Sequence, residues 1–577
     1  MAATKQRDEE AAAGPAAAAD EQAPRPQGAA MDALLTDSGP GGVGRFIPGK
    51  PIAKAVGRLA ARPDRVAKRL GTTAKESAKV WAGRSEIEPP KGDRRFKDDA
   101  WRGNPAFKRL SQLYLLWGRE VDGLIDDADL DWQDERRLRF AADNVVGALA
   151  PTNFPAANPA VLKATLDNGG SNLTSGAKKF VKDMARSPRI PNMVDTSGFE
   201  IGENIAVTPG AVVLRTEVFE LIQYEPRSSS VHEVPLVVVP PMINKYYVTD
   251  LAENRSMVQH QLDAGQQVFV LSWRNPDEQF AAWGLDTYAA AVVEALDAAQ
   301  AITASDSVHV LGLCAGGIVT SAVAAHLFAK GEGDRIAGIS LGVCVLDNDK
   351  AGTMGAMVDR EVAALAIADS ARRGYLKGQS LAGVFAWLRP NDLVWNYWVN
   401  NYLLGKEPPA FDILFWNADS TNLPAGLHRD FLEMSIENSI VHPGELTVLG
   451  TPIDLSKITA PTYLVAGIAD HIIPWENAYK TVNLFGSDPR FVLSTSGHIA
   501  ALVNPPGNEK ASFQTNAANP ATPEEWLEGA SKQRGTWWDD WATWLSEHSG
   551  KDKRKPTKLG QRGFKPLGSA PGEYVHG

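Results

Sequence analysis

The chain has 577 residues, 44% of them hydrophobic, and a formal net charge of −10. This length exceeds one ordinary domain, so we expect one large domain with a smaller neighbour. The acidic balance disfavours a nucleic-acid-binding protein, and two cysteines are too few for a disulfide framework. The sequence has no signal-peptide-like run at its start and no stretch near the roughly 20 apolar residues that span a bilayer. We therefore expect a soluble, cytoplasmic protein without a transmembrane segment.

The N-terminal part is polar and then basic. Residues 1–40 are mainly alanine, proline, glycine and charged residues, a composition that cannot offset the entropy lost on ordering and predicts disorder. In the basic stretch that follows, Ile52, Val56 and Leu59 lie at helical spacing among lysines and arginines. We favour a solvated, partly helical tail; the alternative is an amphipathic segment that contacts an interface or partner. We assign residues 1–90 to this disordered or basic tail.

Helical periodicity begins after this tail. Apolar residues recur at spacings of three and four, as in the stretch that contains Leu110, Leu113 and Leu116. Such spacing places these side chains on one face of an amphipathic helix. We therefore predict a helical N-terminal domain over residues 91–205.

After residue 205 the pattern changes to short, β-rich apolar runs, several of them separated by helical stretches. The six runs cover residues 234–241, 266–273, 308–313, 336–346, 460–467 and 490–496. Continuous apolar strands that alternate with helices predict an α/β fold with a mostly parallel sheet covered on both faces. An insertion rich in Trp and Asn, at about residues 347–450, is expected to cap the carboxyl edge of the sheet, where such folds bind ligands. We assign residues 206–577 to this catalytic domain.

The sequence VHVLGLCAGGIVT, residues 308–320, places Cys314 between an expected strand and an expected helix. It fits a sharp turn that presents a nucleophile above the sheet, and Gly312 and Gly316 supply the small neighbours that such a turn needs. Backbone N–H groups and the helix dipole favour a thiolate and a developing oxyanion there. We interpret Cys314 as a nucleophile rather than as a structural cysteine. The second cysteine, Cys344, is expected to fill the core.

A thiol nucleophile needs a base, and the base needs a group that orients it. In sheets of the hydrolase type, these groups follow the nucleophile in the order acid, then histidine. Asp470 follows the fifth apolar run in AGIADHIIPW, and His498 follows the sixth in STSGHIAAL. We predict a triad of Cys314, Asp470 and His498, with a capping or core histidine as the alternative for His498. His471 competes for the role of base, and we rank it as a supporting residue.

A second oxyanion donor should come from a backbone N–H in the loop after the first long strand. That loop reads PPMINKYYVTD and contains Ile243, our candidate beside the N–H of Ala315. Asp250 ends the same segment as a further supporting residue, with a helix cap as its alternative. Cysteines and histidines do not cluster at metal-ligand spacing, so we predict neither a metal nor a cofactor.

Several motifs together resemble the polyhydroxyalkanoate synthases, the single-subunit class I type most of all. They are GLCAGG, PPMINKYYVTDL, LSWRNPD, LRPNDLVWNYWVNNYLLGKEPPAFDILFWNADSTNLPAGLH, AGIADHIIPW and SGHIAALVNPP, with DAWRGNPAFKRLSQLYLL near the start of the match and GTWWDDW and APGEYV near its end. The resemblance runs from about residue 93 to residue 577. It implies an α/β-hydrolase fold with a cap insertion.

The resemblance also implies the reaction: (R)-3-hydroxyacyl groups pass from coenzyme A (CoA) to a growing polyester, and CoA is released. Cys314 would hold the chain as a thioester and His498 would accept the thiol proton. Asp470 would either orient His498 or help to activate the incoming 3-hydroxyl. Cysteine suits this cycle because exchange between thioesters is nearly isoenergetic, whereas transfer to an alcohol is downhill. The length of the chain and its N-terminal region favour C3–C5 substrates such as 3-hydroxybutyryl-CoA.

Other functions stay open from the sequence. A thioesterase or polyester depolymerase with the same triad is disfavoured by the cysteine and the cap, and a non-catalytic granule-surface subunit is disfavoured by the complete triad. A medium-chain polyhydroxyalkanoate synthase is the third alternative. The expected partners are the acyl-CoA, the polyester, the granule surface with phasin-type proteins, and a second copy in a homodimer, but not nucleic acid.

Overall fold

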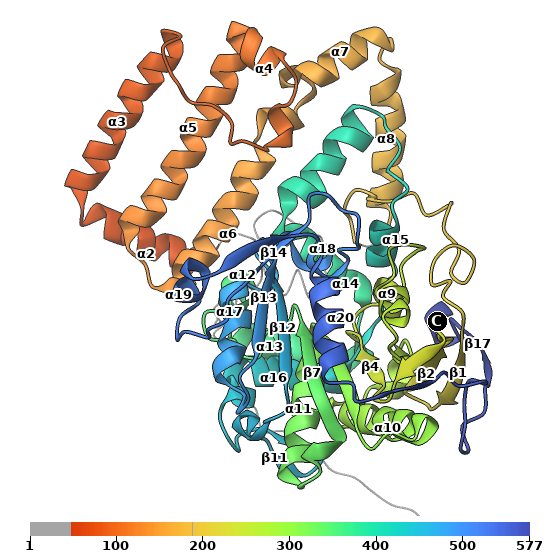
Figure 1. Cartoon of the computed structure of the whole chain (residues 1–577). Helices are drawn as coiled ribbons and strands as arrows, with labels where there is room; N and C mark the ends of the chain where they lie inside the picture. Colours follow the sequence, from red (N-terminus) through yellow and green to blue (C-terminus); the bar gives the residue numbers. More distant parts are fainter. Residues whose placement is uncertain (1–47, 187) are drawn as a thin grey trace, which may run out of the picture.

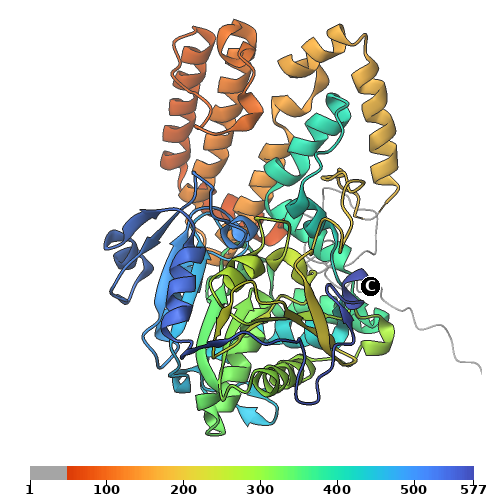
Figure 2. The same ribbon diagram turned by 45° about the vertical axis from the view of Figure 1, so that its right-hand side comes forward.

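The computed structural model describes residues 48–186 and 188–577. A mixed β-sheet lies at the centre of the lower part of the molecule, and the N-terminal helices stand above it, with α7 and α8 apart from α2–α6 (Figures 1 and 2). In the described part of the chain, no helix is both long and apolar enough to cross a bilayer.

The described residues contribute eleven strands to this sheet, in the order β15-β14-β13-β12-β7-β6-β4-β5-β2-β1-β17. Its six parallel strands are β4 (Leu236–Val239), β5 (Val268–Trp273), β6 (Val308–Leu313), β7 (Ile336–Gly342), β12 (Thr462–Gly467) and β13 (Arg490–Ser494). These are the six apolar runs of the sequence, and the predicted α/β fold is confirmed. Parallel strands in the middle of a sheet are buried on both faces, which explains their continuous apolar character.

The antiparallel strands at the two edges were not predicted. They are β1 (Gly210–Arg215), β2 (Phe219–Tyr224) and β17 (Gly568–Ser569) at one edge, and β14 (Ser512–Thr515) and β15 (Ser531–Arg534) at the other. Their sequences explain the omission. β15 reads SKQR and is exposed throughout, and β2 buries the polar Glu220 and Gln223 within an otherwise apolar run. Pairing with a neighbouring strand, rather than hydrophobic pattern, makes these segments strands.

Helices cover both faces of the sheet. They are α9 (Met257–Asp263), α10 (Leu285–Thr303), α11 (Ala315–Ala329), α17 (Trp475–Tyr479), α18 (His498–Leu502), α19 (Pro523–Glu528) and α20 (Trp537–Glu547). In β5, Val268 and Val270 belong to the same buried cluster as the tryptophans of α20, whereas Phe269 and Leu271 belong to the cluster of α10 and α11. Because successive strand residues point to opposite faces, the two clusters are the two halves of the core.

The N-terminal domain is larger than the sequence predicted. Its helices are α2 (Gly49–Ala60), α3 (Pro63–Trp81), α4 (Ala100–Gly103), α5 (Pro105–Ala128), α6 (Trp132–Ala148), α7 (Pro159–Asp167) and α8 (Ser171–Met184). The helical part of the predicted tail is confirmed, because α2 and α3 form within residues 49–81. The disorder assigned to residues 1–90 is wrong for this stretch, since both helices pack against α5. The predicted disorder of residues 1–40 lies outside the described residues.

The basic side chains of α2 and α3 explain this difference. Lys54 in α2 binds Asp131, and Arg69 in α3 binds Asp127 with 2.6 Å between Nε and Oδ2. Both carboxylates lie near the acidic junction of α5 and α6. The basic segment thus packs on an acidic surface of the same chain. Contact with another interface or partner, its alternative interpretation, remains a prediction.

The insertion between β7 and β12 forms the cap. It contains α12 (Gly352–Met357), α13 (Arg360–Arg373), β8 (Tyr375–Leu376), α14 (Gly378–Leu388), two π-helical turns, η8 (Asn391–Trp395) and η9 (Trp398–Leu403), then α15 (Asp412–Ala418), β9 (Leu423–Pro424) and α16 (Ala425–Glu437). The N-terminal domain holds the π-helical part through side chains that bond to backbone atoms. Asn172 in α8 donates to the Leu403 carbonyl at 2.8 Å, and the Trp398 indole donates to the Asn153 carbonyl at 3.1 Å.

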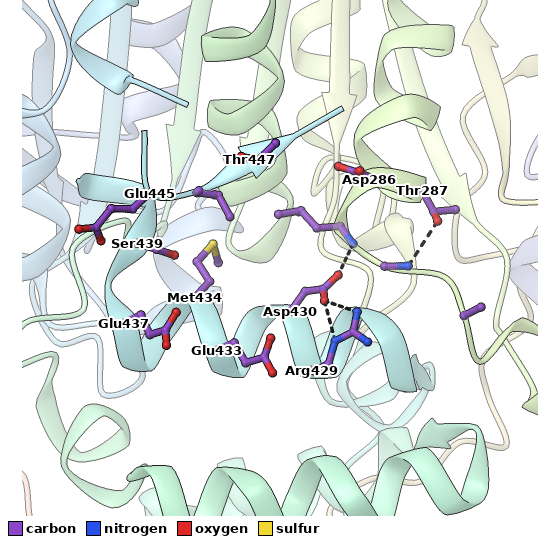
Figure 3. A pocket seen from close by; sticks show the side chains of 14 residues that line it. Asp286, Thr287, Arg429, Asp430, Glu433, Met434, Glu437, Ser439, Glu445 and Thr447 are labelled. Carbon is purple, nitrogen blue, oxygen red and sulfur yellow. Dashed lines mark hydrogen bonds and ion pairs between the residues drawn. The ribbon is translucent and has the colours of Figure 1, made fainter. Parts of the chain in front are cut away.

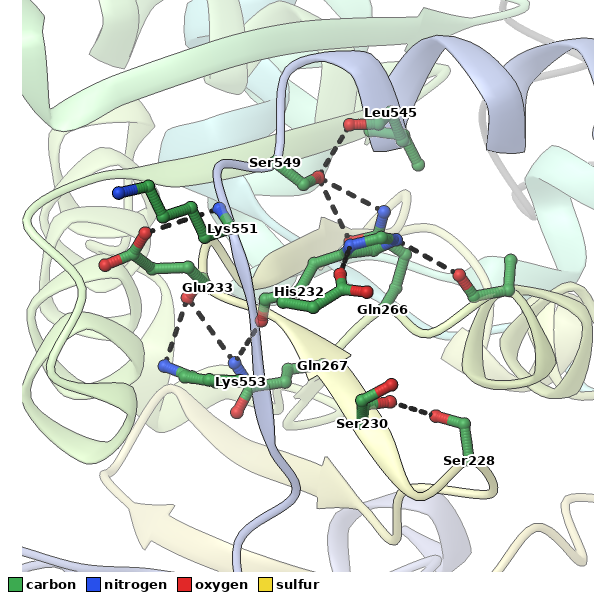
Figure 4. Close-up of polar contacts among 12 residues, drawn as sticks. Ser228, Ser230, His232, Glu233, Gln266, Gln267, Leu545, Ser549, Lys551 and Lys553 are labelled. Atoms are coloured by element: carbon green, nitrogen blue, oxygen red, sulfur yellow. Dashed lines mark hydrogen bonds and ion pairs between the residues drawn. The ribbon is translucent and has the colours of Figure 1, made fainter.

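The last residues wrap around the sheet domain. β16 (Asp552–Arg554) pairs with β3 (Ser230–His232), and β17 extends the edge of the large sheet. A buried polar pair anchors the start of this segment: Gln266 donates to the Ser549 hydroxyl at 3.2 Å, and Ser549 donates to the Leu545 carbonyl at 2.6 Å (Figure 4). The C-terminal segment therefore returns to the first strands of the sheet domain, β1 and β3.

Candidate active site

Cys314 lies at the turn between β6 and α11, at the carboxyl edge of the parallel strands. Its φ of 49° and ψ of −120° are strained for a non-glycine residue, as expected for a nucleophile held in a sharp turn. Steric constraints require glycine at both flanking positions. A Cβ on Gly312 would lie 2.6 Å from the Gly317 Cα, and one on Gly316 would lie 2.3 Å from the Val239 carbonyl oxygen.

Two neighbouring strands bring the other triad residues to the same edge. Asp470 follows β12, and His498 begins α18 just after β13. The His498 Nδ1 lies 2.6 Å from Asp470 Oδ2, and both side chains are buried. The second oxygen of Asp470 accepts the backbone N–H groups of Ile472 and Ile473 at 2.9 and 3.0 Å. With Nδ1 bound to Asp470, Nε2 of the imidazole is left for Cys314.

The charge state of His498 reflects two opposing effects. Burial acts to lower the pKa of the imidazole, but the Asp470 carboxylate and the nearby Cys314 side chain outweigh burial and raise that pKa to about 10. An imidazole with a raised pKa retains the thiol proton well. His498 is therefore placed to accept the thiol proton of Cys314 and to hold it.

His471 lines the cavity that also contains Cys314 and His498. Burial is the main cause that lowers its pKa to about 4, with Arg389 acting in the same direction. The side chain is therefore neutral near pH 7, and its Nδ1 is buried without a hydrogen-bond partner among the described residues. His498 is the histidine that is hydrogen-bonded to the Asp470 carboxylate. The supporting role of His471 stays a prediction.

Asp250 and Cys344 occupy the protein interior instead. The Asp250 carboxylate accepts the Ser256 hydroxyl at 2.7 Å and the Thr208 hydroxyl, and burial raises its pKa. It links two backbone segments and does not line the cavity around Cys314, which favours a structural role for this residue. Cys344 is buried in the core, where a Cβ on Gly317 would meet its Sγ at 2.7 Å. This is the position that the sequence predicted for the second cysteine.

The two candidate oxyanion donors lie beside the nucleophile. Ala315 is the first residue of α11, so its N–H has no acceptor within the helix. Ile243 lines the cavity with Cys314. The cap fixes the loop around Ile243, because the Thr421 hydroxyl donates to the Met242 carbonyl at 2.7 Å and the Thr421 N–H donates to the Ile243 carbonyl at 3.2 Å.

A cavity of about 370 Å³ opens beside Cys314 and His498. Its lining is largely apolar and comes mainly from the cap and the loops at the strand ends. Arg389 adds a positive charge, and Asn244 and Asn417 add amide groups. A largely apolar cavity around a cysteine–histidine pair suits acyl transfer in which contact with water is limited.

Comparison with known proteins identifies the family. A family model for the N-terminus of poly-beta-hydroxybutyrate polymerase (PhaC) matches residues 92–261, and a model for the alpha/beta hydrolase fold matches residues 235–505. The chain is 44% identical over 525 residues to poly(3-hydroxyalkanoate) polymerase 1 of Ectopseudomonas oleovorans, which covers 91% of this chain and 94% of that protein. The chain belongs to the poly(3-hydroxyalkanoate) polymerase family. The resemblance read from the motifs is confirmed.

A second relative supports the same assignment. The chain is 41% identical over 500 residues to poly(3-hydroxyalkanoate) polymerase subunit PhaC of Cupriavidus necator, covering 85% of this chain and 84% of that protein. These alignments span most of both chains, so the shared family covers the N-terminal helices as well as the hydrolase fold.

Several lining residues of this polymerase-family site were not predicted. Arg389 and Phe385 come from the cap, and Met193 comes from the segment that follows the N-terminal helices. Their positions carry no strand–turn–helix pattern comparable to that of Cys314. They reach the site only through packing of the cap, and the one signal available was the unusual density of Trp and Asn in the cap sequence.

Two other cavities lie away from this site. One, of about 420 Å³, is lined by acidic residues of α16 and by the start of α10, where Asp430 accepts the Leu285 N–H at 2.8 Å (Figure 3). The other, of about 720 Å³, lies between Trp132 of α6 and the cap. Within residues 48–186 and 188–577, no three His, Cys, Asp or Glu side chains are grouped to hold a metal ion. That no metal or cofactor takes part remains a prediction.

Proposed function

We propose that this protein polymerises (R)-3-hydroxyacyl groups from CoA thioesters and releases CoA. The observation that carries the proposal is the Cys314–His498–Asp470 constellation at a largely apolar cavity, in a chain of the poly(3-hydroxyalkanoate) polymerase family. The expected location is the surface of cytoplasmic polyester granules.

The first half of the cycle loads the enzyme. The Cys314 thiolate attacks the acyl carbonyl of the CoA thioester, and the N–H groups of Ala315 and Ile243 stabilise the oxyanion. The carbon–sulfur bond to CoA then breaks, and the CoA sulfur takes the proton held by His498. The acyl group remains on Cys314 as a thioester of nearly equal energy.

The second half extends the chain. The 3-hydroxyl of one hydroxyacyl unit attacks the carbonyl of the thioester on Cys314, and its proton passes to His498. The bond between the acyl carbon and the Cys314 sulfur breaks, the sulfur leaves as a thiolate, and an ester bond replaces the thioester. We assign the orienting role to Asp470. Its support is that one carboxylate oxygen binds the His498 ring and the other binds the N–H groups of Ile472 and Ile473. Activation of the 3-hydroxyl by Asp470 itself is the alternative.

The hydroxyacyl substrate is expected to be short, C3–C5, as the length of the chain and its N-terminal region suggest. The cavity of about 370 Å³ also leaves room for a longer side chain, so the medium-chain alternative stays open. A thioesterase is disfavoured because apolar walls around Cys314 limit the entry of water. A homodimer and contact with phasin-type proteins remain predictions.

The direct test follows free CoA and turbidity together, with (R)-3-hydroxybutyryl-CoA as substrate and Cys314→Ala alongside. We expect both signals from the wild type and neither from the variant. Cys344→Ala is the matched control, because it removes the other thiol and should keep polymerisation. CoA release without turbidity would indicate a thioesterase and overturn the proposal. Release only from (R)-3-hydroxyoctanoyl-CoA would keep the reaction but show that the short-chain preference is wrong.

A further inference from the structure

We propose that Met193 limits the length of the acyl side chain, although it lies outside the hydrolase fold. It belongs to the segment of residues 188–195, which we call the linker because it joins the N-terminal helices to the first strands. Met193 is half-buried and lines the cavity that holds Cys314. This inference rests on the proposed function and adds to it a residue that determines specificity.

The linker is fixed on both sides of Met193. The Asn192 N–H donates to the Asp183 carboxylate at 3.0 Å, and its carbonyl accepts the Asn401 amide at 2.7 Å. On the other side of Met193, the Asp195 N–H donates to the Pro409 carbonyl at 3.1 Å. These bonds join α8, the π-helical turn η9 and the approach to α15. The Met193 side chain is therefore presented to the cavity by a held backbone rather than by a free loop.

Neighbouring packing places the linker against the cap. A Cβ on Gly383 in α14 would lie 3.5 Å from the Pro188 ring, so α14 and the start of the linker are in van der Waals contact. Figure 1 shows the chain after α8 running beside α15 before it enters β1. Val194, the next residue after Met193, is 3% exposed and anchors this path.

Met193 belongs to a lining that is largely apolar. We call the apolar side chains that the linker, α14 and the segment around α15 contribute to it the apolar wall; they include Met193, Ala382, Phe385, Phe411, Ile413 and Leu414. A Cβ on Gly497 would meet the Arg389 guanidinium at 3.4 Å and the His471 ring at 4.0 Å, which places both beside the catalytic loop.

The polar and the apolar side chains of the lining suit different parts of the substrate. CoA carries phosphates and amides, which match the Arg389 guanidinium and the asparagine amides. The alkyl group on C3 of the hydroxyacyl unit is apolar and matches the apolar wall. Methionine is long and unbranched, so its thioether fills space that each added methylene of the alkyl group would need. The structure therefore assigns to Met193 a boundary of the alkyl site.

The test varies the size of residue 193 and measures kcat/KM for (R)-3-hydroxybutyryl-CoA and (R)-3-hydroxyoctanoyl-CoA. Met193→Ala should raise the octanoyl-to-butyryl ratio by about tenfold, since one methylene in an apolar pocket is worth about tenfold or more. Met193→Phe should lower the ratio, and Met193→Leu should leave it within about twofold. Met184→Ala, at the end of α8 and away from the lining, is the matched control and should not change it.

The outcomes separate this inference from the proposed function. An unchanged ratio in both Met193→Ala and Met193→Phe, with polymer still formed, overturns the inference alone. Equal losses for both substrates in these variants also overturn it, because Met193 would then line the path common to all CoA thioesters. Absence of CoA release from the wild type overturns the proposed function. If Met193→Ala fails to fold, the Leu and Phe variants still give the size series.

Discussion

The catalytic edge of the sheet and the cap opposite it are built in different ways. The triad residues stand at the ends of parallel strands whose side chains are buried on both faces, and their neighbours are fixed by backbone contacts such as the Cys314 N–H to the Gly342 carbonyl at 2.9 Å. The cap contains two π-helical turns and is held by polar side chains of the N-terminal domain. The catalytic residues are thus held by the rigid sheet. The shape of the cavity instead depends on how the linker around Met193 packs against α14 and α15.

The largest expected effect is on the catalytic edge. Asp470→Asn keeps the shape of the side chain but removes the charge that raises the pKa of His498, so burial should then lower that pKa. We expect CoA release at pH 7 to fall by about 10²- to 10⁴-fold, the usual contribution of a positioned acid–base group. Asp263→Asn, which removes an exposed carboxylate bound to Arg227, should change nothing. Activity near the wild-type level in Asp470→Asn would contradict the assigned role.

The same variant gives a pH-dependent difference in stability. The pKa of His498 is raised from 6.5 to about 10 in the folded protein, so its ion pair contributes fully below about pH 6.5 and is lost as the pH rises through 10. The difference in free energy of unfolding between wild type and Asp470→Asn should therefore shrink between pH 7 and pH 10. Urea unfolding at several pH values measures it, and a constant difference would refute this explanation.

The turn at the nucleophile should be the next most sensitive point. Gly316→Ala places a Cβ 2.3 Å from the Val239 carbonyl and 2.7 Å from the Pro240 carbonyl, so the loop that carries Ile243 must move. A displacement near 1 Å at the reacting groups is expected to lower the rate of CoA release about 100-fold. Gly103→Ala, where a Cβ meets nothing within 4 Å, is the control. Equal rates in the two variants would show that the turn tolerates a methyl group.

On the cap side, a similar clash should affect stability more than chemistry. A Cβ on Gly176 in α8 would lie 1.8 Å from the Tyr402 carbonyl in η9. Gly176→Ala should therefore lower the free energy of unfolding by about 1–3 kcal/mol while the triad remains intact. Gly71→Ala, in the interior of α3 with open space around it, should instead stabilise by about 0.5–1 kcal/mol. A loss of CoA release in Gly176→Ala as large as that in Gly316→Ala would remove the distinction between the two regions.

The smallest expected effect concerns the packing of α2. Lys54 binds Asp131 and also Asp134, at 2.7 Å, at the surface. Lys54→Ala should lower the unfolding temperature slightly, and high salt should abolish the difference because exposed ion pairs are screened. Lys50→Ala, in the same helix, is the control. A difference that persists in high salt would mean that the Lys54 side chain stabilises by packing instead.

The sequence alone determined the central strands and the residues at their ends. The six parallel strands are buried on both faces, so they appear as continuous apolar runs, and the turn at Cys314 requires glycines for steric reasons that act within a few residues. Local constraints of this kind are visible in the sequence. The positions of Asp470 and His498 followed because hydrolase-type sheets place these groups after particular strands, and the structure brings both to one edge.

Only the tertiary structure decided the rest. The sequence suggested a solvated tail for α2 and α3 because the carboxylates that pair with their basic side chains are distant along the chain. These carboxylates, Asp127 and Asp131, lie more than 50 residues away. The edge strands β14, β15 and β17 lack a continuous apolar run and form through pairing with their neighbours. The lining of the cavity joins Met193 to α14 and α15 across about 200 residues of sequence. Contacts between such distant segments depend on complementary surfaces in the folded protein, and the periodicity of the sequence does not predict them.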